Sequence, residues 1–170
     1  MCQIYTAIDS SSGGLFAPFV LNFRYKKSGY TLSMGKESGH LKKDAGTPLL
    51  VVGTSAKSGI SLLDGREFSA THCLDACEAL QILRLGRYQA VLCDLELPGE
   101  GGMMLVSSVQ AGFPDVAVVV ITRPGKLRNG ILAMMAGASG YIQAPLQPEI
   151  VTASLRSAMR RKQLDSAMRG

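Results

Sequence analysis

The sequence predicts an α/β fold: an open, doubly wound sheet of five parallel strands with helices on both sides. Three observations predict it. From Pro48 onward, short β-rich runs alternate with helical patterns, which is typical of repeated βα units. The run 116–121 is apolar at six successive positions, as expected of a strand buried on both faces. Apolar residues form 46% of the 170-residue chain and aromatic residues only 6%, which favours a parallel sheet between helices over a large β-sandwich.

Five strands and five helices are predicted in strict alternation. Each predicted strand is a short apolar or β-branched run bounded by turn residues or by the start of a helix. The strands are predicted at Leu49–Val52, Phe68–Cys73, Tyr88–Cys93, Val116–Ile121 and Tyr141–Ile142.

The predicted helices are recognised by apolar residues that recur three and four positions apart. The second has the clearest start, because Asp75 and Glu78 have the spacing of a capping box. The five helices are predicted at Lys57–Leu63, from Ala76 to Gly86, at Met103–Gln110, from Leu127 to Gly137, and from Pro148 through Met159.

Residues 1–46 do not follow this alternation and are predicted to form an N-terminal extension or arm. Phe19–Tyr25 and Tyr30–Met34 flank a Lys-Lys-Ser-Gly turn and favour a β-hairpin, and Gln3–Ile8 favours a further strand. An arm packed on the core or on a partner and a partly disordered segment are equally compatible with this composition. Residues 47–164 are predicted as the α/β domain and 165–170 as a C-terminal tail.

The net charge of +5 is concentrated at the two ends of the chain. Residues 1–47 carry six basic and three acidic side chains, whereas 48–155 carry seven basic and nine acidic ones. A nucleic acid or an acidic membrane surface could use the basic residues of the first segment, although a solvated basic extension is the favoured interpretation. These residues are Arg24, Lys26, Lys27, Lys36, Lys42 and Lys43.

The four cysteines indicate a reduced, cytoplasmic protein. Cys2, Cys73, Cys77 and Cys93 form no CxxC pair and no secreted-type spacing, and we expect them to be reduced core residues. His72 beside Cys73 and Cys77 does not make a favoured metal site. Neither a signal peptide nor a membrane span is predicted.

The functional site is expected where the carboxyl ends of the strands meet the point at which the strand order reverses. Four predicted strand ends deliver polar or small residues to that edge. They are Gly53 with Thr54, Asp94, Thr122 and Ala144.

Residues at these positions resemble the receiver domains of bacterial response regulators, over roughly residues 48–162. An Asp-Leu-x-Leu-Pro string with a Gly four residues after the Pro is fairly specific when Gly-Ala-x-x-Tyr follows at the right distance. The matching strings are Leu49–Val52, Asp94–Pro98 with Gly102, Val119–Thr122, and Gly137–Ile142 with Pro145. The resemblance implies the flavodoxin-like (βα)5 receiver fold.

The same resemblance implies that Asp94 is the candidate phospho-acceptor. In the family this Asp receives a phosphoryl group from a histidine kinase. A Mg²⁺ ion held by that Asp and an acidic pair assists the transfer, together with a Lys before the fifth-strand Pro. Here Gly53 and Thr54 replace the acidic pair and Ala144 replaces the Lys. Because an anionic carboxylate needs cations to approach a phosphoryl group, we expect no cofactor beyond weak Mg²⁺ binding.

The resemblance also implies a switch, in which Thr122 contacts the phosphoryl group and Tyr141 reports that contact to the surface of the last two helices and the fifth strand. It further implies a cis peptide at Ala144-Pro145. Structural roles stay open for these residues: Asp94 and Thr122 as loop caps, and Tyr141 as a half-buried aromatic.

We therefore predict an atypical receiver in two-component or phosphorelay signalling that acts as a protein-interaction module, not as an enzyme. One alternative is a functional phospho-accepting receiver that uses Asp94. Another is a small α/β nucleotide-binding protein or enzyme, which the sequence supports less because it has no P-loop or GxGxxG turn.

The expected partners are a histidine kinase, a phosphotransfer protein or a downstream effector. A homodimer through the last helix is also predicted, from its four clustered basic residues, and direct DNA binding is not. These basic residues are Arg156, Arg160, Arg161 and Lys162.

Overall fold

The computed structural model describes residues 46–61, 63 and 67–170. It contains one sheet of five parallel strands in the order β2-β1-β3-β4-β5. The strands are β1 (Thr47–Val52), β2 (Phe68–Cys73), β3 (Ala90–Asp94), β4 (Ala117–Thr122) and β5 (Gly140–Gln143). This confirms the predicted doubly wound α/β fold. The hairpin, the further strand and the basic residues predicted in the first segment, with Cys2, lie outside the described residues.

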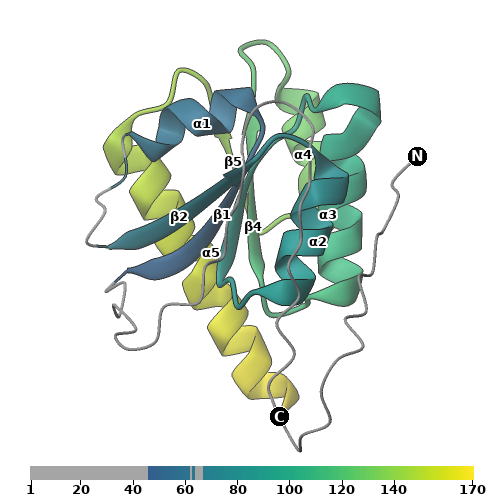
Figure 1. Cartoon of the computed structure of the whole chain (residues 1–170), viewed down its shortest axis with the longest axis vertical. Helices are drawn as coiled ribbons and strands as arrows, with labels where there is room; N and C mark the ends of the chain where they lie inside the picture. The colour runs from purple at the N-terminus through teal and green to yellow at the C-terminus, as the bar shows by residue number, and fades with distance from the viewer. Residues whose placement is uncertain (1–45, 62, 64–66) are drawn as a thin grey trace, which may run out of the picture. The chain divides into compact units, whose positions relative to one another are not determined.

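Helices cover both faces of the sheet (Figure 1), with α2, α3 and α4 on one side and α1 and α5 on the other. The right-handed crossovers of a parallel sheet produce this arrangement when the strand order reverses, here between β1 and β3. The helices are α1 (Thr54–Ile60), α2 (Ala76–Leu85), α3 (Gly101–Gly112), α4 (Leu127–Met135) and α5 (Pro148–Arg169), and a 3-10 turn (Pro98–Glu100) precedes α3.

Three helices differ from their predicted bounds. Helix α3 extends two residues further at each end than the predicted Met103–Gln110. Helix α1 begins at Thr54, three residues earlier than predicted, because the chain turns at Gly53 directly after β1. Helix α5 continues to Arg169, so most of the segment predicted as a tail is helical.

The central strands are buried on both faces, which explains their continuous apolar sequences. Successive residues of β3 enter opposite halves of the core: Val91 and Cys93 pack with α2 and α3, whereas Ala90 and Leu92 pack with α1 and α5. Since neither face meets water, no polar alternation is visible in the sequence of these strands. Asp94 is the one charged residue of β3 and stands at its carboxyl end.

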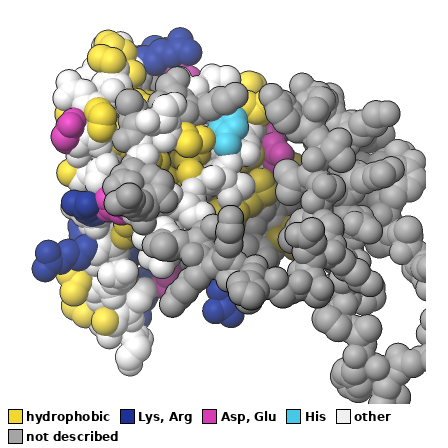
Figure 2. Space-filling model, turned by 60° about the vertical axis from the view of Figure 1, so that its left-hand side comes forward, with side chains coloured by type: hydrophobic (Ala, Val, Ile, Leu, Met, Phe, Trp, Pro, Cys, Tyr) yellow, Lys and Arg dark blue, Asp and Glu magenta, His cyan; other side chains and the backbone are white. Residues whose placement is uncertain are grey.

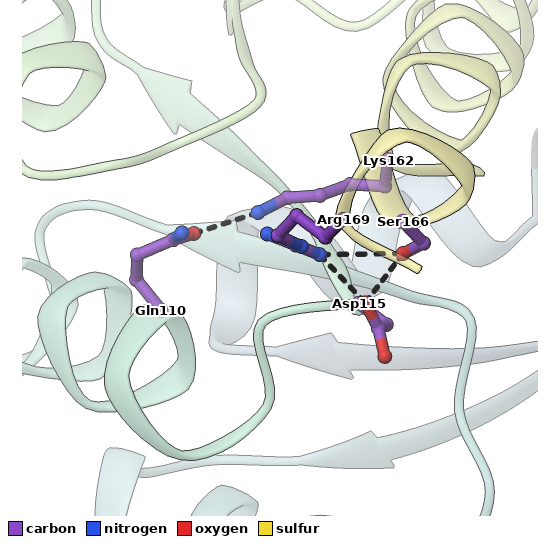
Figure 3. Close-up of polar contacts among 5 residues, drawn as sticks. All are labelled: Gln110, Asp115, Lys162, Ser166 and Arg169. Atoms are coloured by element: carbon purple, nitrogen blue, oxygen red, sulfur yellow. Dashed lines mark hydrogen bonds and ion pairs between the residues drawn. The ribbon is translucent and has the colours of Figure 1, made fainter. Parts of the chain in front are cut away.

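The second half of α5 is fastened to α3 and to the segment before β4 (Figure 3). The Lys162 Nζ donates to Gln110 Oε1 at 2.8 Å, and Asp115 Oδ1 accepts from Ser166 Oγ at 2.5 Å and from Arg169 at 2.8 Å. Burial of the ammonium, followed by repulsion from Arg169, lowers the pKa of Lys162. These contacts hold α5 at the edge of the sheet opposite Asp94.

The cysteines are only partly as predicted. Cys73 and Cys93 are buried, but Cys77 is exposed, because it lies on the side of α2 that faces away from the core. Burial raises the pKa of Cys73 to about 12, and burial together with the adjacent Asp94 raises the pKa of Cys93 as well.

In a Cys2→Ser background, a thiol reagent at pH 8 is expected to modify Cys77 quickly and the two buried thiols only as the protein unfolds. The attacking species is the thiolate, which burial suppresses at Cys73 and Cys93. Peptide mass mapping over time checks this. The native state also retains thiol protons that the unfolded chain loses above about pH 8.5, so stability should fall as the pH rises beyond that value. Fast labelling of Cys93 without denaturant would contradict the prediction.

Candidate functional site

The predicted site residues lie together at the carboxyl edge of the sheet. Asp94 ends β3 and pairs in register with Ile121, the residue before Thr122 on β4. Ala144 follows β5, and its N–H donates to the Thr122 carbonyl oxygen at 2.9 Å. The Ala144-Pro145 peptide is cis, as the resemblance implied. Because parallel strands point their carboxyl ends to one edge, Gly53 and Asp94 become neighbours although 41 positions separate them in the sequence.

Asp94 is only 4% exposed, and backbone N–H groups from two loops approach its carboxylate. The Glu96 N–H donates to Oδ1 at 3.1 Å, and the Ser55 N–H of α1 lies 3.4 Å from Oδ2. A buried carboxylate needs such donors, because desolvation otherwise penalises its charge. Asp94 therefore links the loop after β3 to the start of α1.

Gly53 brings the backbone of the loop after β1 directly against Asp94. Its φ of +99° lies in the region that favours glycine, and a Cβ built there would be 2.7 Å from Asp94 Cβ and 2.9 Å from Leu97 Cδ2. The His72 Nε2 lies 3.1 Å from the Gly53 carbonyl oxygen, which can only accept, so the tautomer with a proton on Nε2 makes a hydrogen bond here. The space beside Asp94 is thus occupied by main chain where the resemblance implied a carboxylate side chain.

Thr122 and Tyr141 meet over α4. The Thr122 hydroxyl, which is buried, donates to the Ile142 carbonyl oxygen at 3.3 Å. Gly130 of α4 leaves room for both side chains, since a Cβ there would lie 3.1 Å from Tyr141 Cδ2 and 3.3 Å from Thr122 Cγ2. Tyr141 itself is 40% exposed. The two residues named as a switch therefore touch the same glycine, while the hydroxyl of the first is bonded to β5.

A cluster of charges beside Asp94 was not predicted from the sequence. Glu96 Oε2 accepts from Arg123 Nε at 2.8 Å, and Glu96 Oε1 lies 3.6 Å from Lys126 Nζ. We call these three residues the Glu96 cluster. They join the loop after β3 to the loop after β4. Glu96 is 27 residues or more from the two cations in the sequence, and local sequence patterns do not predict contacts over such a separation. The available clue was a stretch from 116 to 148 that holds cations but neither Asp nor Glu.

Three of the four basic residues predicted to mediate a dimer are bound within the chain. Arg156 pairs with Glu67, Arg161 donates to the Ser139 carbonyl oxygen, and Lys162 donates to Gln110. On the face drawn in Figure 2, the described Lys and Arg side chains form separate groups with hydrophobic and acidic side chains between them. The described part of this face has no continuous basic track.

In the part of the chain that the structure describes, no group of three or more His, Cys, Asp or Glu side chains could hold a metal ion. Within the same residues, no helix has the length and apolar character needed to cross a membrane.

Comparison with known proteins agrees with the geometry of the strand ends. Residues 55–156 match the family model of the response regulator receiver domain. The chain belongs to this family. Receiver domains are signalling modules of two-component systems, and this receiver domain has the flavodoxin-like fold of its relatives.

Among curated relatives of this receiver domain, FleR of Pseudomonas aeruginosa is 30% identical over 54% of this chain and 19% of its own length. BaeR of Escherichia coli is 29% identical over 69% of this chain and 50% of its own length. MtrA of Mycobacterium tuberculosis, described as a DNA-binding response regulator, is 31% identical over 59% of this chain and 43% of its own length. The chain thus spans half or less of the length of these relatives.

Solved structures agree on the fold. A response regulator receiver domain from Clostridium thermocellum superposes with a TM-score of 0.60 at 25% identity, over 69% of this chain and 98% of that one. A putative response regulator from Chloroflexus aurantiacus gives a TM-score of 0.62 at 24% identity, over 67% of this chain and 98% of that one.

Proposed function

We infer that residues 47–164 form an atypical receiver that signals through protein contact, without efficient Mg²⁺-dependent phosphorylation of Asp94. The observation that carries this inference is the position of Gly53, whose main chain occupies the space beside the acceptor carboxylate. Asp94 is then a structural link between two loops at least as much as an acceptor.

The donor atoms at the edge of the sheet do not fit Mg²⁺, which prefers an octahedral set of oxygens that includes carboxylates. Asp94 is buried and held by main-chain donors, and Gly53 brings no side chain. The carboxylate of Glu96, two residues after Asp94, is engaged by Arg123 and Lys126. At the position of the lysine, Ala144 brings a methyl group. These residues therefore do not fit a metal ion that would assist phosphoryl transfer.

The surface that supports protein contact runs along α4 to β5. Leu127, Ile131 and Met135 recur four residues apart on α4 and are 49–80% exposed, and Tyr141 of β5 lies beside the same helix. We call these four residues the α4 face. An exposed apolar stripe of this kind is typical of an interaction site, and a histidine kinase, phosphotransfer protein or effector is the proposed partner.

Two further expectations have different support. A homodimer through α5 stays a prediction, with less support from charge than the sequence indicated, because three of its four cations have partners within the chain. The absence of direct DNA binding likewise stays a prediction.

Beryllofluoride and Mg²⁺ test the inference directly. We expect no mass adduct and no change in amide NMR shifts around Asp94 at millimolar Mg²⁺, because the described residues contain no group of three or more His, Cys, Asp or Glu side chains that could hold the ion. The Asp94→Asn variant is the matched control, and a receiver that has the acidic pair shows that the reagent is active. A stoichiometric adduct that disappears in Asp94→Asn would establish the alternative, a functional phospho-acceptor.

A further inference from the structure

The strongest unassigned feature of this receiver is the concentration of positive charge around the start of α4. Arg123 and Lys126 have side chains that are 64% and 56% exposed, and Arg128 is also exposed. No Asp or Glu occurs from 116 to 148, so this stretch supplies no acid of its own to balance these cations. The carboxylate that compensates them belongs to a different loop.

That carboxylate, Glu96, is unevenly bound. Its Oε2 is in close contact with Arg123 at 2.8 Å, whereas its Oε1 lies 3.6 Å from Lys126, too far for a hydrogen bond. Oε1 is buried and accepts no hydrogen bond among the described residues. The Glu96 carboxylate therefore lies near two cations but is within hydrogen-bonding distance of Arg123 only.

Another carboxylate could replace Glu96 at Arg123 and Lys126 at a small cost in free energy. Arg123 and Lys126 are more than half exposed, so water and salt already compete with Glu96 for these two cations, although the Glu96 side chain itself is only 21% exposed. A second carboxylate with good geometry could bind Arg123 or Lys126 at a charge-assisted distance of about 2.8 Å. The two cations of the Glu96 cluster can thus bind a carboxylate from outside the chain.

The cations lie beside the apolar residues of the α4 face. Lys126 immediately precedes α4, and Leu127 is the first residue of that helix. A partner that covers the α4 face brings its own flanking residues to these cations. The surface therefore favours a helix that has an apolar stripe bordered by Asp or Glu.

We propose that an acidic amphipathic segment of a partner docks on the α4 face and displaces Glu96 from Arg123 and Lys126. This proposal rests on the protein-contact function above and specifies its partner. The main-chain N–H of Glu96 donates to Asp94 Oδ1, so the residue whose side chain the partner displaces is also one that holds the Asp94 carboxylate. Partner binding and the Asp94 loop are thereby coupled without phosphate.

Two synthetic helical peptides of about 18 residues, or five turns, test the exchange. Both carry Leu at the same four-residue spacing, and one has Glu where the other has Lys. Fluorescence anisotropy is expected to show that the Glu peptide binds about tenfold more tightly at low salt, with the preference shrinking as salt screens the charges. The NMR signal of Arg123 Nε–H should shift with the Glu peptide only.

Substitutions separate the exchange from general attraction. Glu96→Gln removes the internal competitor and should raise affinity for the Glu peptide by about two- to fivefold. The Arg123→Gln, Lys126→Gln double variant should remove the preference, and Arg84→Gln at the exposed end of α2 should leave it unchanged. Equal binding of the two peptides, binding of neither, or weaker binding by Glu96→Gln would each overturn the proposal.

These outcomes are independent of the beryllofluoride result. A stoichiometric adduct at Asp94 would refute the proposed function and leave the measured acid preference intact. Equal binding of the peptides would remove the exchange and leave the phosphate-independent function in place.

Discussion

Gly53→Ala is expected to lose roughly 2 to 6 kcal/mol of unfolding free energy, one of the largest effects of a single methyl group in this receiver. Two costs combine. A non-glycine residue at φ +99° carries about 1–3 kcal/mol of strain, and the new Cβ would overlap Asp94 Cβ at 2.7 Å and Leu97 Cδ2 at 2.9 Å, which adds about 1–3 kcal/mol. Urea unfolding followed by circular dichroism measures the loss.

Gly125→Ala is the matched control. Gly125 also has a positive φ, +81°, but a Cβ there meets nothing within 4 Å, so only the strain of roughly 1–3 kcal/mol applies. The difference between the two variants reports the overlap at Asp94. Equal stabilities would mean that Asp94 and Leu97 move aside freely and that the pocket is less tightly filled than the distances indicate.

The same geometry predicts that Mg²⁺ chemistry cannot be restored by one residue. Gly53→Asp, alone or with Ala144→Lys, should gain no beryllofluoride adduct, because the new side chain starts from a Cβ that already collides with Asp94. The main-chain position of Gly53 therefore leaves no room for a carboxylate side chain beside Asp94.

Gly102→Ala is expected to cost roughly 1 to 3 kcal/mol despite the better helix propensity of alanine. Gly102 lies in the first turn of α3, and a Cβ would be 2.3 Å from the Leu95 carbonyl oxygen and 2.7 Å from its carbonyl carbon. Rigid main chain cannot yield as a flexible side chain can, so the helix or the loop after β3 must shift. Since Glu96 follows Leu95, we also expect the amide signals of Glu96 and Asp94 to move.

Gly112→Ala, at the other end of the same helix, provides the comparison. A Cβ at Gly112 meets nothing within 4 Å, so alanine should be neutral or stabilising by up to about 1 kcal/mol. Chemical denaturation of both variants decides the matter. If Gly102→Ala were as stable as Gly112→Ala, the close packing of α3 on Leu95 would be refuted.

Much of the fold could be predicted from local sequence. The apolar run of β4, the Phe68–Cys73 strand and the Leu127 start of α4 agree with their predicted bounds within a residue. A strand buried on two faces is a continuous apolar run, and a helix buried on one face repeats its apolar residues every three or four positions. At the site, Asp94 could be found because an acidic residue that ends a buried strand stands out against its neighbours. Helix α1 was misplaced because Gly53 turns the chain through a main-chain conformation that has no periodic pattern.

The sequence by itself determined the parallel α/β architecture and the position of Asp94 at the end of a buried strand, and its resemblance to receiver domains predicted that Gly53, Thr54 and Ala144 stand where the family has the acidic pair and the lysine. Only the tertiary structure decided which atoms fill the space beside Asp94 and which carboxylate balances the positive charge of Arg123 and Lys126. Gly53 presses main chain against Asp94, and Glu96 reaches across to Arg123 and Lys126. Contacts of this kind join separate loops at one edge of the sheet, and no local pattern records them.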